Sequence, residues 1–215
     1  MSEEKQKLIL PRPHLSWSAM NCWISSPARF RREYFECGKK LDTKYLRFGK
    51  GIAEMIENGT YKELLPDLEV YPVSEHEIRT TIRGVPILSY LDDYDPENNI
   101  FREKKTGKKS KTGKPPWTQA KVIKHGQLVF YATALKHSVG KMPEYCHLDW
   151  IETREKTKDE VDDFWRENEK ALQVTGVVKS FYREFDEREV EKVEDLIEKS
   201  AWEISEAYQD FLKEI

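Results

Sequence analysis

Alternating and clustered apolar positions predict several short strands in the first half of the chain. Apolar and polar residues alternate in 77–83, and apolar runs lie at 68–74 and 85–94. A fourth run, 100–105, follows the turn sequence Pro-Glu-Asn-Asn at 96–99. Such runs bounded by turn residues are typical of strands, and the pair on either side of the turn predicts an antiparallel hairpin. We expect a mixed sheet of about four strands here.

Helical spacing and capping residues predict helices before and after these strands. Ser16 or Ser18 can cap a first short helix, and Ser26 followed by Pro27 begins a second that ends at Gly38. Further helices are expected over 45–57, 117–137, 159–172 and 186–215. Two later apolar runs, 145–152 and 174–185, predict additional strands.

Composition favours a folded protein outside the membrane. The chain has 215 residues, which is long enough to bury a full core, and 12% of them are aromatic, which argues against disorder. It contains neither a long apolar run nor the pattern of a signal peptide, so we expect a soluble, cytoplasmic protein, in the host cytoplasm if it is viral. Residues 1–13 are expected to form a flexible lead-in, and residues 14–215 a single domain.

The three cysteines do not form a motif. Cys22, Cys37 and Cys146 lie far apart and are odd in number, and no CxxC pair is present. This pattern favours reduced, buried thiols over a disulfide framework or a zinc site.

Basic residues are concentrated in one segment, although the net charge of the chain is −3. Between residues 102 and 124 the only acidic residue is Glu103. Such a segment suits a phosphate backbone, and its candidate nucleic-acid contacts are Lys108, Lys109, Lys111, Lys114 and Lys124. It is not a nucleotide-binding P-loop, because Pro115 occupies the position that requires Ser or Thr.

The hairpin ends in a cluster of charged residues. Side chains two apart on a strand share a face, so Glu103 and Lys105 point together toward the region that Asp92 can reach from the partner strand. Two carboxylates can hold Mg²⁺ or Mn²⁺ beside a phosphodiester, while a lysine orients a water and screens developing charge.

Several motifs, taken in order, resemble the RecB-like branch of the PD-(D/E)XK nuclease superfamily. The series is Asp92, then Glu103-Lys-Lys105-Thr-Gly, then Gln127 and Tyr131 four residues apart. The segments Leu-Ser-Trp-Ser and Pro-Ala-Arg-Phe near the N-terminus are similar to those of the same branch. The resemblance implies an α/β, restriction-endonuclease-like fold with a central mixed β-sheet flanked by helices. It also implies a metal-dependent DNA nuclease, an exonuclease acting in repair or recombination, in phages or in CRISPR-associated processing.

The resemblance also implies roles for individual residues. Asp92 and Glu103 would bind Mg²⁺ or Mn²⁺, and Lys105 would position the attacking water. Gln127 and Tyr131 would line the nucleic-acid side of the site, on one stripe with Lys124. His125, a lone histidine, is expected at the surface and not as a ligand.

Three positions leave alternatives open. Asp93 is an alternate to Asp92, because register cannot be fixed from sequence. The metal-binding histidine that the family usually carries is replaced by Ala53, so Glu54, with Glu57 behind it, is the expected substitute ligand. Ser26 stands where some members have a cluster cysteine, which predicts that no iron–sulfur cluster is bound.

Two other functions fit the same motifs. A nuclease fold can serve as an inactive DNA- or protein-binding module, and a structure-specific endonuclease would use the same chemistry. In each case the expected partner is DNA, as single strands or duplex ends, with a protein partner in a recombination or CRISPR-related complex.

Overall fold

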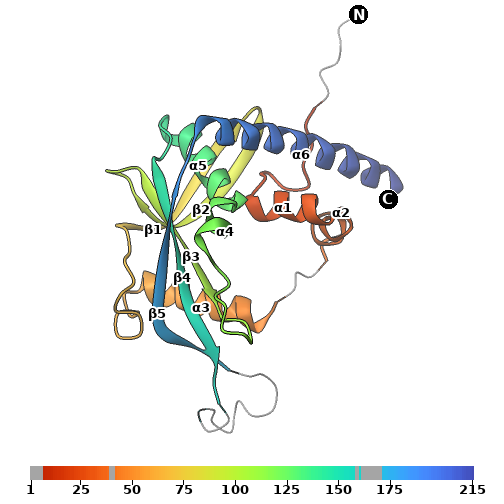
Figure 1. Cartoon of the computed structure of the whole chain (residues 1–215). Helices are drawn as coiled ribbons and strands as arrows, with labels where there is room; N and C mark the ends of the chain where they lie inside the picture. The colour runs from red at the N-terminus through yellow and green to blue at the C-terminus, as the bar shows by residue number, and fades with distance from the viewer. Residues whose placement is uncertain (1–6, 39–41, 158–159, 161–170) are drawn as a thin grey trace, which may run out of the picture.

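A computed structural model of the chain describes residues 7–38, 42–157, 160 and 171–215. Its centre is a twisted five-stranded sheet in the order β1-β2-β3-β4-β5 (Figure 1). Neighbouring strands are antiparallel except β3 and β4, which are parallel. The strands are β1 (Val73–Ile82), β2 (Val85–Asp95), β3 (Ile100–Gly107), β4 (Tyr145–Glu155) and β5 (Leu172–Glu184).

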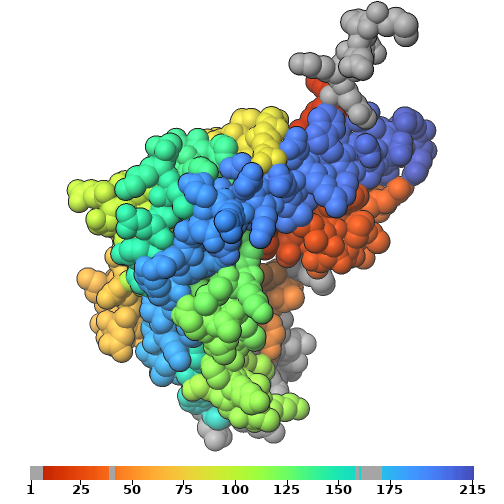
Figure 2. All heavy atoms as spheres, turned by 45° about the horizontal axis from the view of Figure 1, so that its top comes forward, coloured from red at the N-terminus to blue at the C-terminus, as the bar shows by residue number. Residues whose placement is uncertain are grey.

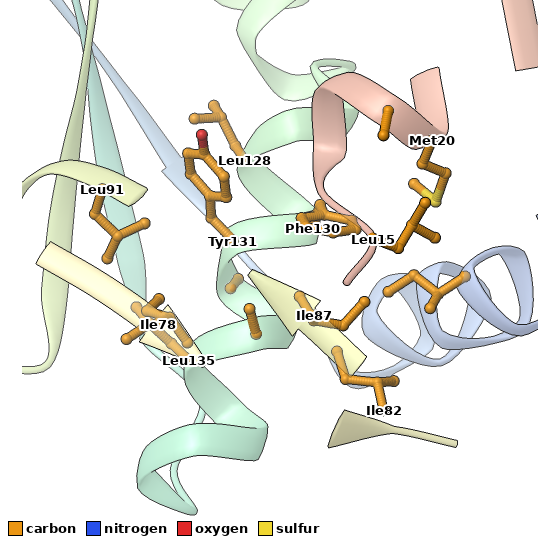
Figure 3. Close-up of a cluster of buried hydrophobic side chains, with 14 of the residues drawn as sticks. Leu15, Met20, Ile78, Ile82, Ile87, Leu91, Leu128, Phe130, Tyr131 and Leu135 are labelled. Carbon is orange, nitrogen blue, oxygen red and sulfur yellow. The ribbon is translucent and has the colours of Figure 1, made fainter. Parts of the chain in front are cut away.

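Helices cover both faces of this sheet. They are α1 (Trp17–Ser25), α2 (Pro27–Phe30), a π-helical turn (Arg31–Phe35), α3 (Lys44–Glu57), α4 (Gln119–Ile123), α5 (Gly126–Val139) and α6 (Glu187–Glu214). The larger core lies between the sheet and α1, α5 and α6, where Leu128, Phe130 and Leu135 of α5 lie against β1 and β2 (Figure 3). A smaller core joins Ile52 and Ile56 of α3 to Ile151 of β4.

The predicted hairpin is confirmed, and its two strands pair only at the turn end. Residue pairs in the β2–β3 ladder are Asp93 with Arg102, Tyr94 with Phe101 and Asp95 with Ile100. Asp95 accepts hydrogen bonds from the Glu97 and Asn98 amides at 3.0 and 3.1 Å, which fixes the turn. Beyond Asp93 and Arg102 the strands separate, while β3 continues along β4.

The predicted strand over 68–74 is wrong. Tyr61, Leu65 and Leu68 lie in successive turns and pack with α3 in the smaller core, and strand β1 begins only at Val73, after Pro72. A proline cannot donate to a ladder, so pairing starts after it. The sheet reaches five strands through β4 and β5, which were expected as the additional strands 145–152 and 174–185.

The long helix expected over 117–137 is interrupted at Lys124 and His125. Arg183 of β5 donates to the carbonyls of Val122 and His125 at 3.2 and 3.0 Å, so the interruption is stabilised by a distant strand. Lys124 therefore ends α4 and does not share a helical stripe with Gln127 and Tyr131.

The other predicted elements agree with the structure. Ser16 caps α1, Ser26 caps α2 with Pro27 at its first position, and Asp186 caps the terminal helix. The expected helix at 159–172 falls almost entirely outside the described residues, and Leu172 begins β5.

Two further features complete the description of the fold. Cys22 and Cys146 are buried as predicted, whereas Cys37 is exposed. Within the described part of the chain, no helix combines the length and apolar character needed to cross a bilayer.

Candidate active site

Asp92 occupies the gap between the separating strands of the hairpin. Its carboxylate accepts a hydrogen bond from the Lys104 amide at 2.5 Å, which replaces the missing ladder contact between β2 and β3. Burial raises the pKa of Asp92, although this amide and the charges of Lys105 and Lys104 oppose the shift. The separation of β2 and β3 therefore places the Asp92 carboxylate between the two strands.

Glu103 and Lys105 lie together on β3, as the two-residue alternation predicted. The Lys105 ammonium donates to Glu103 Oε1, and Glu103 is only 2% exposed. Burial, followed by repulsion from Asp92, raises the pKa of Glu103 to about 8. Although burial opposes it, the charges of Glu103 and Asp92 raise the pKa of Lys105. The three side chains thus form one electrostatically linked cluster.

Asp93 points away from this cluster. It forms an ion pair with Lys104 and accepts hydrogen bonds from the Ser74 hydroxyl at 3.3 Å and the Tyr71 amide at 3.4 Å. Its oxygens are occupied by protein donors, whereas Asp92 faces the Glu103 side of the site. Of the two neighbouring aspartates, Asp92 is therefore the one that joins the Glu103–Lys105 cluster.

A cavity of about 350 Å³ opens between α3 and the separated strands. Asp92, Lys105 and Lys104 line it from the sheet, and Glu57 lines it from α3. Ala53, the position at which the sequence resemblance expects a histidine, also lines this cavity, whereas Glu54 is exposed and does not line it. The structure thus places the alternate, not the preferred glutamate, beside the cluster.

Glu75 of β1 also lines this cavity, although it belongs to none of the sequence motifs. Its φ is 49°, and burial, then the charges of Asp92 and Glu57, raises its pKa. Nothing in the alternation of β1 distinguishes this glutamate, because its position depends on a left-handed backbone conformation.

Gln127 and Tyr131 lie on one side of α5, with the Gln127 amide donating to the Tyr131 hydroxyl at 2.7 Å. Burial and the charge of Glu103 raise the pKa of Tyr131, which is therefore a neutral phenol beside the carboxylates. Figure 3 shows Tyr131 among the buried side chains of the larger core, beside Leu128 of the same helix. The two motif residues are brought together with the β3 cluster.

His125 is partly buried, contrary to the expected surface position. Its Nε2 is buried and lacks a hydrogen-bond partner among the described residues. Burial, then the charges of Lys105 and Arg183, lowers its pKa to about 4, so the imidazole is neutral. No spacing in the sequence indicates that this histidine lies close to Lys105.

The residues present fit a divalent cation bound by few protein ligands. Glu103 Oε2 is buried and has no hydrogen-bond partner among the described residues, and the neighbouring Asp92 is half-buried and lines the cavity. Across the described ranges, no group of three or more His, Cys, Asp and Glu side chains forms a complete metal cage. Mg²⁺ commonly uses one or two carboxylates and completes its shell with water and substrate phosphate, so the Asp92–Glu103 pair suffices.

The basic segment follows β3 and forms an exposed loop; Figure 2 shows this green segment standing out below the blue C-terminal helix. Lys108 and Lys109 pair with Glu155 and Glu152 at 3.0 and 2.9 Å. Lys111 and Lys114 lie exposed at the loop tip. Lys124 is exposed at the end of α4, apart from this loop.

Comparison with solved structures identifies the fold. A candidate exonuclease from Eubacterium rectale superposes with a TM-score of 0.56 over 92% of this chain and 82% of its own, at 9% identity. A phage-related exonuclease from Haemophilus somnus 129PT gives a TM-score of 0.51 over 86% and 79%, at 14% identity. No protein-family model matches the sequence, and comparison with the curated proteins yields no significant match. The expected α/β fold, a central mixed β-sheet flanked by helices, is confirmed, and it is shared with these two exonuclease structures.

Proposed function

We propose that this protein is a metal-dependent DNA exonuclease that hydrolyses phosphodiester bonds. The observation that carries the proposal is the convergence of Asp92, Glu103 and Lys105 where β2 and β3 separate, with Asp92 and Lys105 lining a cavity and Glu103 buried behind them. The two similar solved structures, which are named as exonucleases, support the exonucleolytic assignment. Because their sequence identity to this chain is low, the roles of individual residues rest on the geometry of this chain.

Each residue of the cluster has a defined task. Asp92 and Glu103 would hold Mg²⁺ or Mn²⁺, which supplies Lewis-acid stabilisation of the phosphate when bound. Lys105 has three N–H donors and gives one to Glu103, so two remain to orient a water for attack and to stabilise a phosphoryl oxygen. Gln127 orients the Tyr131 hydroxyl beside Glu103, where both can contact the bound strand.

The proposal predicts cleavage that depends on both a divalent metal and a free DNA end. End-labelled linear DNA and closed circular DNA are incubated with Mg²⁺, with Mn²⁺ and with EDTA, and products are resolved on a gel. We expect linear DNA to be shortened to nucleotides with metal and to stay intact in EDTA. Cleavage of circular DNA would indicate an endonuclease, and binding without cleavage of any DNA would indicate a binding module.

The basic loop is proposed to track the phosphate backbone. Replacing Lys111 and Lys114 with serine is expected to reduce the salt dependence of DNA affinity, with the slope of log K against log salt falling by about 0.7 to 0.9 per lysine. Replacing Lys108 and Lys109 should have a smaller effect, because each already faces a carboxylate. Affinity is measured across a salt series in a Glu103→Gln background.

A different result would reject this role for the loop. An unchanged slope in the Lys111 and Lys114 variant would exclude phosphate contacts by these residues. A selective loss of affinity for some sequences would indicate base contacts instead, which flexible lysines on a loop are poorly suited to make.

A further inference from the structure

Two apolar side chains stand exposed at one end of the active-site cavity. Tyr45 and Leu46, in the first turn of α3, are 47% and 58% exposed, and both line the cavity that contains Asp92 and Lys105. The smaller core takes Phe48, Ile52 and Ile56 from this helix but neither of these two residues. Neither packing nor phosphodiester chemistry therefore accounts for an aromatic ring at this position.

One stripe of α3 connects this ring to the acidic end of the cavity. Tyr45, Gly49, Ala53 and Glu57 are spaced four residues apart, and all four line the cavity. Residues four apart lie on one helix face, and this stripe extends for roughly 18 Å at 1.5 Å per residue. The two small residues at its centre leave a shallow path from the aromatic ring to the carboxylates.

Cationic side chains surround the same ring. The ammonium groups of Lys44 and Lys108 lie 5.4 and 6.0 Å from the Tyr45 ring centroid. Lys50, one turn further along α3, lines the cavity as well. Because Lys44 and Lys108 also face Glu155, at 4.0 and 3.0 Å, Lys50 is the lysine assigned to phosphate here. An aromatic ring beside such a lysine suits single-stranded nucleic acid, because a base stacks on the ring while the lysine neutralises a phosphate.

We propose that Tyr45 is a stacking platform for an unpaired base of the strand being cut, at the end of the α3 stripe opposite Glu57. A base in a duplex is covered by its stacked neighbours and its pairing partner, so only a single-stranded or frayed end can offer a free face to the ring. Lys50 contacts the backbone of that strand between the platform and the carboxylates. This inference rests on the proposed nuclease function and specifies its substrate as a single-stranded DNA end.

Binding by variants of Tyr45 tests the platform. In the non-cutting Glu103→Gln background, Tyr45→Ala should weaken affinity for a single-stranded oligonucleotide by about 5- to 100-fold, the range expected for one lost base stack. Tyr45→Phe should retain the affinity, because the ring is kept. Affinity for a blunt duplex should not change. Tyr90→Ala removes an equally exposed tyrosine, 44% accessible, that does not line the cavity, and should have no effect.

A fluorescent base locates the contact. An oligonucleotide with 2-aminopurine at successive positions should show quenching at one position when Tyr45 is intact or carries the Tyr45→Phe substitution, and none with Tyr45→Ala. Equal weakening on single strands and duplex, loss with Tyr45→Phe, or unchanged affinity in Tyr45→Ala would each overturn the platform. Cutting by protein with intact Glu103 is assayed in parallel. If cutting persists while the platform fails, only the platform is rejected, whereas absence of cutting rejects the proposed function separately.

Discussion

Replacing Lys105 with methionine is expected to slow DNA cleavage by about 10²- to 10⁴-fold, the usual effect of removing a group that positions a nucleophile or stabilises transition-state charge. Methionine keeps most of the length of the side chain but cannot donate a hydrogen bond to Glu103 or to a water. The fold should persist, because Glu103 can accept a proton when its cationic partner is removed. The measurement is the single-turnover rate at saturating DNA, with circular dichroism to verify folding.

Matched substitutions separate catalysis from stability. Lys136→Met removes an ammonium from α5 that pairs with Glu187, and should leave the rate unchanged. Asp92→Asn should share the loss seen for Lys105, whereas Asp93→Asn should mainly lower the melting temperature, since Asp93 binds Lys104 and Ser74. Cleavage by the Lys105→Met variant at the parental rate would exclude a role for Lys105 in the mechanism.

Metal binding is expected to strengthen as pH rises from 6 to about 8. The pKa of Glu103 is raised to about 8, so the metal-free protein carries a proton that must leave before the carboxylate can bind a cation. Apparent affinity should rise by up to about tenfold per pH unit and level off above pH 8. At a fixed metal concentration above the Kd, the metal-induced rise in melting temperature should increase by about 3 to 5 °C per unit.

The metal-free protein should show the opposite trend. The folded state holds the Glu103 proton between pH 4.5, its ordinary pKa, and about 8, whereas the unfolded state has lost it, so stability should fall as pH rises through this window. Thermal melts with and without Mg²⁺ test both trends, and Glu103→Gln should flatten them. A metal-induced shift that is identical at pH 6 and pH 9 would contradict the assignment of Glu103 as a ligand.

The hairpin and the capped helices could be predicted because their signals are local. The turn residues at 96–99 join two adjacent strands, and the caps Ser26 and Asp186 accept hydrogen bonds from amides three residues later in the chain. The interruption between α4 and α5 could not be predicted in this way, because Arg183 stabilises it from a distant strand. The turns around Leu68 could not be predicted either, because a short apolar run packs equally well in a strand or in a turn.

For the site, alternation was sufficient to place Glu103 and Lys105 on one face, but not to choose among neighbouring acids. The choice between Asp92 and Asp93 depends on where β2 and β3 separate, which is a property of the sheet. The choice between Glu54 and Glu57 depends on how α3 is rotated against the sheet. The position of Glu75 in the cavity depends on its left-handed backbone conformation. These are tertiary features without a local sequence signal.

The single parallel pairing in the sheet determines when the site can form during folding. The β2–β3 hairpin closes through a short turn, so Asp92 and Glu103 can approach early. Strand β3 is paired on its other side only when Phe101 meets Cys146, after the basic loop and both α4 and α5 have been accommodated. Gln127 and Tyr131 lie within that long connection, so the chain brings its carboxylates together locally but completes the substrate side through a much longer loop closure. A partly folded chain would thus hold the acidic residues without the surface that positions a strand to be cut.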